Sequence, residues 1–277
     1  CLTFAPESNE QMIVAGYIAS LFIGVALGLI GGGGSILTVP VLVYLFHVDA
    51  VLATAYSLFI VGVTSFVGGV RAHIKKLVDV KIAIVFAVPS FIAVFLTRRF
   101  IVPEIPELLF SLGNFQVTKD IGLLLFFALI MVAAALSMIL KKKEKADLKV
   151  IKKQLNLKLI LLEGAVVGLI TGLVGAGGGF LIIPALVIFA KLPMKTAVGT
   201  SLAIIAAKSL IGFLGDLGAA QNIDWFFLLS ITAIAVIGIF VGSWLRKFVD
   251  GKKLQKAFGW FVLAMAVYIV LKETISK

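Results

Sequence analysis

Gly28-Leu-Ile-Gly-Gly-Gly-Gly-Ser-Ile-Leu-Thr-Val-Pro40 is a glycine run inside apolar sequence, and it returns without a gap as Gly172-Leu-Val-Gly-Ala-Gly-Gly-Gly-Phe-Leu-Ile-Ile-Pro184. The offset of 144 residues holds from Gly24/Gly168 to Gly68/Gly212, so the chain consists of two related halves. Consecutive glycines interrupt a helix. Duplicated halves that each contain a glycine-broken hydrophobic segment point to the binding site of a transporter.

Composition places the chain in a membrane. Of its 277 residues, 61% are hydrophobic and 14% are charged, which leaves too little polar surface to cover a water-soluble globule. Several apolar runs reach the ~20 residues that a helix needs to span the hydrocarbon core. We therefore predict an all-α polytopic protein of the cell (inner) membrane, surrounded by the lipid bilayer. The net charge of +11 comes from basic residues in short loops, which indicates topology and no nucleic-acid partner.

Length alone leaves two arrangements for the glycine runs. The segments after them, 35–47 and 180–190, are too short as helices to cross a ~30 Å hydrocarbon core. Each run is therefore either a kink in one long crossing helix or the tip of a hairpin that returns to the same side. Because cytoplasmic loops collect lysine and arginine, the charges distinguish the two. The hairpin arrangement puts 19 basic residues inside and 5 outside, against 14 and 10 for the single crossing, and is favoured.

The predicted fold is two inverted repeats, each a glycine-broken hairpin followed by about three transmembrane helices. The first membrane repeat covers residues 1–140, a basic cytoplasmic linker covers 141–156, and the second repeat covers 157–277. The turn after the first hairpin carries no lysine or arginine, whereas the equivalent turn carries Lys191 and Lys195, as expected if the turns face opposite sides.

Two other segments carry weaker expectations. Residues 101–119 contain two prolines and a glycine, and we expect an external interfacial loop there. Cys1 is the only cysteine, which excludes an intrachain disulfide. Its place at the first position suggests a processed or trimmed N-terminus.

The residues around the second glycine run resemble a known family. Gly175-Ala-Gly-Gly-Gly-Phe-Leu-Ile-Ile-Pro184, followed by Ala197-Val-Gly-Thr-Ser-Leu202, is similar to the pattern of the sulfite exporter TauE/SafE family, also called TSUP. The first copy departs from it at Ser35 and at Thr54-Ala-Tyr-Ser57. The resemblance covers nearly the whole chain. It implies a small bacterial or archaeal membrane protein with two homologous halves that moves sulfite, sulfonates or other small sulfur-containing anions.

The glycine runs offer backbone chemistry for an anion. Successive glycines can turn their N–H groups into one concavity, and helices that restart at Ile36 and Phe180 add partial positive charge. The other interpretation is close helix packing, which Gly-x-x-x-Gly spacings permit. Hydroxyls on the following helices would complete the oxygen contacts, with Ser65 and Ser209 among them. The predicted substrate-binding residues are Gly31, Gly32, Gly33, Gly34, Ser35, Ser57, Thr64, Gly175, Gly177, Gly178, Gly179, Thr200, Ser201 and Lys208.

Lys208 is the one cation well inside a predicted span, and its equivalent in the first half is Thr64. An intramembrane lysine marks a pairing or pathway residue. We expect Lys208 either to attract an anionic ligand or to exchange a proton. The alternative is that its ammonium reaches the outer interface while its stem stays buried.

Motifs for catalysis are missing from the sequence. It contains no His-x-x-x-His metal spacing, no Gly-x-Ser-x-Gly elbow and no P-loop lysine. We predict a transporter of small anions that works by alternating access or facilitated diffusion, with no enzymatic activity, cofactor or metal. One alternative is a membrane-embedded enzyme or sulfur-group carrier. A second is a cation transporter or channel, although Asp49, Asp216 and Asp224 fall at span edges. The sequence does not identify the substrate, the direction of transport or the coupling ion. A monomer and a homo-oligomer are both compatible with it.

Overall fold

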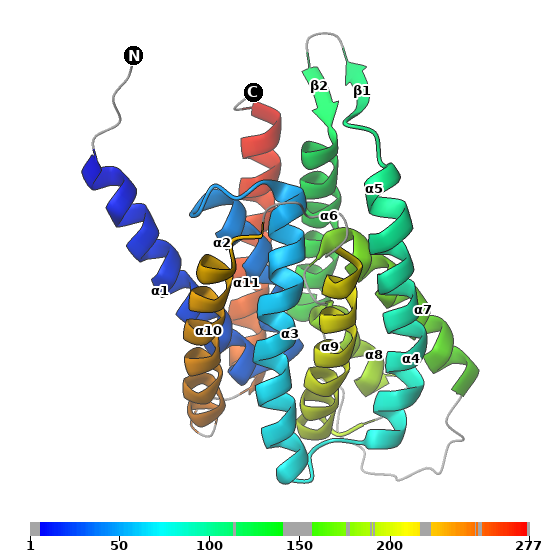
Figure 1. The fold of residues 1–277 in the computed structure, drawn as a ribbon. Coiled ribbons are helices and arrows are strands. Elements are labelled where there is room, and N and C mark those ends of the chain that lie inside the picture. The colour runs from blue at the N-terminus through cyan, green and yellow to red at the C-terminus, as the bar shows by residue number, and fades with distance from the viewer. Residues whose placement is uncertain are drawn as a thin grey trace.

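The computed structural model is a bundle of α-helices that carries one two-stranded β-hairpin (Figure 1). It describes residues 6–112, 115–140, 157–175, 178–188, 190, 192–216, 223–246, 248 and 251–275. The elements of the first half are α1 Pro6–Ile30, the 3₁₀-helix η1 Gly32–Leu37, α2 Thr38–Tyr44, α3 Ala50–Ile74, α4 Val80–Leu96, the π-helix η2 Thr97–Ile101, α5 Val102–Glu104, β1 Leu108–Leu112, β2 Phe115–Thr118 and α6 Lys119–Leu140. Those of the second half are α7 Leu157–Val174, α8 Gly179–Ile188, α9 Met194–Asp216, α10 Trp225–Leu245 and α11 Gly251–Ile275. The predicted linker 141–156 and the position of Cys1 lie outside the described residues.

Within the described residues, six helices are long and apolar enough to cross a membrane. Their apolar windows are Ile13–Ile30, Ala50–Ile74, Val80–Glu104, Lys119–Ser137, Met194–Asp216 and Trp225–Leu245. Large apolar side chains cover the outside of the bundle; Phe226, for example, is 85% exposed. Lipid is the solvent that accepts such faces, and helices satisfy their backbone internally there. The prediction of a helical polytopic membrane protein is confirmed.

Each glycine run turns the chain back on itself. α1 runs inwards from the end of the bundle at which α3 begins, and η1 and α2 return to that end (Figure 1). α7 and α8 form a corresponding hairpin at the opposite end (Figure 1). The ten residues of α8 cover about 15 Å as a helix, half of a ~30 Å hydrocarbon core. The structure therefore contains both chain reversals, and the sides of the membrane to which they open stay a prediction.

The first helix break differs from the sequence prediction. The chain was expected to resume a helix at Ile36, whereas it forms 3₁₀ turns from Gly32 and an α-helix from Thr38. Four successive glycines are poor α-helix formers, and Pro40 fits the first turn of α2 because its missing N–H has no partner there anyway. The second restart, α8, begins at Gly179, one residue before the predicted Phe180.

The segment 101–119 also differs from its prediction, because it contains a β-hairpin where an external loop was expected. β1 and β2 pair antiparallel, with Leu112 opposite Phe115 and Leu108 opposite Thr118. Aromatic and β-branched residues such as those of β2 favour strands. Val117 of β2 is buried, which anchors the hairpin to the bundle.

The helices of the two halves pack in matching pairs around α3 and α9, which lie side by side. α1 packs on α10, and α7 packs on α4; α6 packs on α11. α4 also contacts α9, and α10 contacts α3. Exchanging α1, α3, α4 and α6 for α7, α9, α10 and α11 leaves this set of pairs unchanged. Each half is therefore completed by the other, and neither has a core of its own.

The charge distribution predicts which end of the bundle is cytoplasmic. α3 ends and β1 begins at opposite ends of the bundle (Figure 1). His73 lies in the last turn of α3, Glu107 directly precedes β1, and both are exposed. In a Cys1→Ser background, we expect an impermeant maleimide to label Glu107→Cys in intact cells and His73→Cys only after permeabilisation. Labelling of His73→Cys in intact cells would show that the predicted orientation is wrong.

Candidate functional site

The two glycine runs meet in the interior of the bundle. A Cβ added to Gly32 or to Gly179 would overlap the Cα of the other, so the two runs touch backbone to backbone. Gly31, Gly175 and Gly178 have φ values of 76°, 73° and 59°. Glycine occupies this left-handed region without the strain that a side chain adds. Both reversals of the chain therefore depend on glycine.

One face of α9 lies against these runs. A Cβ on Gly31 would come within 2.8 Å of Val198 Cγ1, and one on Gly178 would come within 2.8 Å of Lys208 Nζ. Ile205 likewise touches Gly32. Because residues three, four and seven apart share a helix face, α9 presents Val198, Ile205 and Lys208 together. Lys208 therefore lies beside Gly178 of the second glycine run.

The Lys208 ammonium is completely enclosed. Its side chain is 0% exposed, and Nζ donates to Thr171 Oγ1 at 2.9 Å. Thr171 Oγ1 in turn donates to the carbonyl oxygen of Val167 at 2.6 Å. No ion pair of Lys208 occurs among the described residues. The ammonium does not reach an interface, so the alternative of a snorkelling lysine is wrong for this conformation.

The predicted hydroxyl residues fall into two groups. Ser57, Thr64, Ser65 and Ser209 are fully buried, and none of their hydroxyls has a hydrogen-bond partner among the described residues. Ser35, Thr200 and Ser201 are also buried but have local partners: Ser35 donates to Gly32 O, Thr200 accepts from Asp79 N, and Ser201 donates to Val198 O. Buried hydroxyls without partners are costly. The first group is therefore the better candidate for ligand contacts.

Two of the remaining predicted glycines, Gly34 and Gly175, pack closely against neighbouring elements. A Cβ on Gly34 would overlap the backbone of α1 at Leu27, and a Cβ on Gly175 would overlap Thr54. Gly33 lies within η1. Gly177 lies outside the described residues. Close packing, the competing interpretation of the glycine runs, is therefore a real role for several of them.

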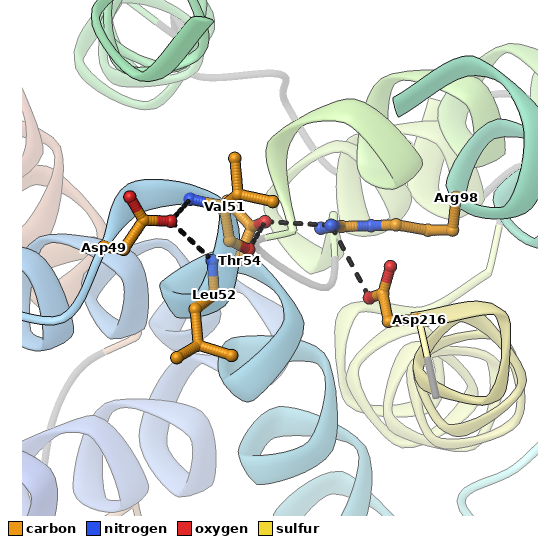
Figure 2. Close-up of polar contacts among 6 residues, drawn as sticks. All are labelled: Asp49, Val51, Leu52, Thr54, Arg98 and Asp216. Atoms are coloured by element: carbon orange, nitrogen blue, oxygen red, sulfur yellow. Dashed lines mark hydrogen bonds and ion pairs between the residues drawn. The ribbon is translucent and has the colours of Figure 1, made fainter. Parts of the chain in front are cut away.

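Arg98 is a second buried cation, although the hairpin arrangement counted it among the five basic residues on the outside. It lies in the π-helical continuation of α4 and is 1% exposed. Arg98 Nη1 donates to Thr54 Oγ1 at 2.9 Å and lies 3.5 Å from Asp216 Oδ2 (Figure 2). With Arg98 counted as buried, the hairpin arrangement still puts more basic residues inside than outside, so the predicted orientation does not change. The contact joins α3, the end of α4 and α9.

Two cavities approach the interior from opposite ends of α3. The Arg98 pocket, of about 320 Å³, is lined by Asp49, Val51, Leu52, Ala55, Arg98, Val102, Pro103, Lys119 and Asp216. The basic pocket, of about 290 Å³, is lined by Gly28, Gly68, Arg71, Ala72, Lys75, Leu77, Lys195, Gly199, Leu202, Ser243 and Arg246. Neither lining includes Lys208 or Gly178. Neither of these two pockets therefore reaches Lys208 in this conformation.

The two pockets use equivalent positions of the repeat. At the 144-residue offset, Val51, Ala55 and Asp216 of the Arg98 pocket correspond to Lys195, Gly199 and Ala72 of the basic pocket. Exchange of the two halves therefore exchanges the two pockets.

The carboxylates that might have served a cation mostly stabilise helix starts. Asp49 accepts from the backbone N–H of Val51 and Leu52 at the start of α3 (Figure 2), and Asp224 does so from Phe227 at the start of α10. These are N-caps, each worth about 1 kcal/mol. The described residues contain no group of three His, Cys, Asp or Glu side chains that could hold a metal ion.

Gly178→Ala should weaken substrate affinity, because the new Cβ would overlap Thr171 Oγ1 and crowd Lys208 Nζ. Gly122→Ala is a control outside the predicted site: its Cβ would likewise overlap a neighbouring side chain, that of Leu109. We expect both variants to lose some thermal stability and only Gly178→Ala to raise the KM for transport. Transport rates are normalised to the amount of folded protein. Equal KM values would assign Gly178 to packing.

Comparison with known proteins identifies the family. Residues 17–269 match the family described as sulfite exporter TauE/SafE. The chain is 28% identical over 260 residues to a probable membrane transporter protein of Xylella fastidiosa, covering 92% of this chain and 93% of that one. It is 27% identical over 287 residues to the probable membrane transporter protein YunE of Bacillus subtilis, covering 94% of each. A third relative, the probable membrane transporter protein MJ0441 of Methanocaldococcus jannaschii, is 34% identical over 129 residues, or 44% of this chain and 48% of its own.

No solved structure matches the chain significantly. The family match includes both glycine runs, Lys208 and both pockets, and it confirms the resemblance seen in the sequence. The chain belongs to the sulfite exporter TauE/SafE family and is a multi-pass membrane transporter, not an enzyme.

Proposed function

We propose that the chain carries small anions, of the sulfite or sulfonate type, through a site beside Lys208 where the two glycine runs meet. The observation that carries the proposal is the fully buried Lys208 ammonium, whose hydrogen-bond partner among the described residues is the neutral hydroxyl of Thr171. An unpaired buried charge costs several kcal/mol. An anion would supply the missing countercharge, which is why intramembrane cations accompany anion pathways.

Hydroxyl groups on α3 and α9 suit the oxygens of such an anion. Ser57 and Thr64 lie seven residues apart on α3, as Ser201 and Lys208 do on α9, so each pair shares one helix face. α8 restarts next to Gly178, where its first N–H groups add partial positive charge. Sulfite and sulfonates present three oxygens on one sulfur. Several hydroxyls and one ammonium match that geometry better than they match a bare halide.

The arrangement of the pockets supports a transport cycle between two inverted halves. The packed helix pairs and the two pockets both interchange when the halves are exchanged. A two-fold relation in the membrane plane would produce this pattern. Opening of one pocket towards Lys208 while the other stays closed would be alternating access; simultaneous opening would be facilitated diffusion.

Purified protein in proteoliposomes tests the proposal. We expect saturable uptake of at least one of radiolabelled sulfite, thiosulfate, sulfate and a short sulfonate, competed by the unlabelled anion and absent from protein-free liposomes. A pH gradient across the same liposomes reports proton coupling. Movement of sodium or potassium without movement of any of these anions would overturn the proposal.

A further inference from the structure

Basic side chains from three helices converge on the basic pocket. Arg71 and Lys75 come from the end of α3, Lys195 comes from the start of α9, and Arg246 follows α10. No acidic residue lines this pocket, whereas the Arg98 pocket at the other end has two acidic and two basic residues. Among the described residues, no ion pair involves Arg71, Lys195 or Arg246. The two equivalent pockets therefore differ strongly in charge.

The basic pocket has small residues in its wall and two arginines in its lining. Gly28, Gly68 and Gly199 form part of the wall, and the volume of about 290 Å³ admits a small oxyanion with some of its water. The Arg71 guanidinium lies 5.3 Å from the centroid of the Phe240 ring. Arg246 is half-buried, and burial lowers the pKa of its guanidinium. Guanidinium groups bind two oxygens of an oxyanion at once.

We propose that the basic pocket is a second anion site, separate from the Lys208 site, that binds a small divalent oxyanion at the end of the bundle with the excess of basic residues. Coulomb attraction grows with the charge of the ligand, so a dianion is preferred to chloride. Gly28 lies in the wall three residues before the first glycine run. In the proposed transport function, on which this role rests, the pocket concentrates the anion before it reaches Lys208.

Inorganic sulfate is the probe. Equilibrium binding of radiolabelled sulfate is measured on the purified full chain in phosphatidylcholine nanodiscs. Loss of one charged hydrogen-bond donor weakens binding by about tenfold or more, and we expect this for Lys195→Gln and for Arg246→Gln. Lys76→Gln is the matched control, because Lys76 is exposed beside Lys75 but does not line the pocket. Its sulfate affinity should equal that of the wild type.

Further measurements distinguish sulfate binding in the basic pocket from binding at other sites. Lys208→Met should keep sulfate binding while losing transport. Sulfate binding that is lost in Lys208→Met and unchanged in Lys195→Gln and Arg246→Gln would overturn the proposal, because the ion would then occupy the Lys208 site. Displacement of the sulfate by soluble glycerophosphoglycerol, the headgroup of phosphatidylglycerol, at a lower concentration than unlabelled sulfate needs would overturn it in favour of a lipid-phosphate site. Sulfate binding with the expected variant pattern, but without transport of any tested anion, supports the pocket and contradicts the proposed function.

Discussion

Lys208→Met should lower kcat/KM for anion transport by about 10- to 100-fold, the value of one charge-assisted hydrogen bond in a buried site. Methionine keeps most of the stem's volume, so little cavity forms. The same substitution removes a fully buried ammonium that no described carboxylate pairs with. We therefore expect the melting temperature to stay the same or to rise, because a desolvation cost disappears. Transport in proteoliposomes and thermal unfolding in detergent measure the two effects.

The combination of lost transport and retained stability distinguishes a ligand role from a structural one. Lys76→Met removes an exposed charge at the end of the bundle and should leave both measurements unchanged. Lys208→Arg should retain some transport only if the residue is a fixed positive charge, because arginine keeps its proton. Wild-type transport by Lys208→Met would remove Lys208 from the substrate site.

The glycine runs were predictable from sequence because they are local features. The repeat, the short segments after each run and the placement of basic residues already indicate two hairpins, and the structure agrees with them. Helix starts are local too: Asp49 and Asp224 precede α3 and α10 and cap them. The β-hairpin has one local signal, since Gly113-Asn114 is a turn dipeptide between two short apolar runs.

Contacts between distant segments were not predictable in this way. Thr171 lies 37 residues from Lys208. The residue equivalent to Thr171 in the first half is the apolar Leu27, so comparison of the two halves gives no sign that Thr171 has a polar contact. Arg98 lies 44 residues from Thr54. One clue to Arg98 was present: Phe100, Ile101 and Val102 continue the apolar run past it. A span that resumes after a basic residue has buried that residue or bent around it.

Arg98→Met should lower the melting temperature by roughly 6 to 20 °C, because removing one member of a buried ion pair costs about 3–5 kcal/mol and leaves the other charge unpaired. The Arg98 and Asp216 side chains are 0% and 10% exposed, respectively. Without the guanidinium, the Asp216 carboxylate loses its nearest countercharge, and Thr54 loses a donor. Asp216→Leu alone should be destabilising for the reciprocal reason.

The double variant Arg98→Met/Asp216→Leu decides whether the pair itself holds α4 to α9. If the cost of each single variant is an uncompensated charge, the double variant should recover most of the lost stability, since apolar replacements of buried ion pairs are often neutral. If the pair supplies net attraction between the helices, the double variant should instead stay about as destabilised as either single variant, because the same interaction is lost only once.

Arg99→Met is the matched control for the two single variants and the double variant. Arg99 is the neighbouring arginine and is exposed, so its loss should change the melting temperature by no more than a surface substitution does. Measuring transport by the double variant then distinguishes a role of the Arg98–Asp216 pair in transport from a role in stability alone. Arg98 touches Thr54, and Thr54 touches Gly175 of the second glycine run. A stable double variant that no longer transports would therefore place this three-residue contact in the movement of the second hairpin, whereas a stable and active one would confine it to the architecture of the bundle.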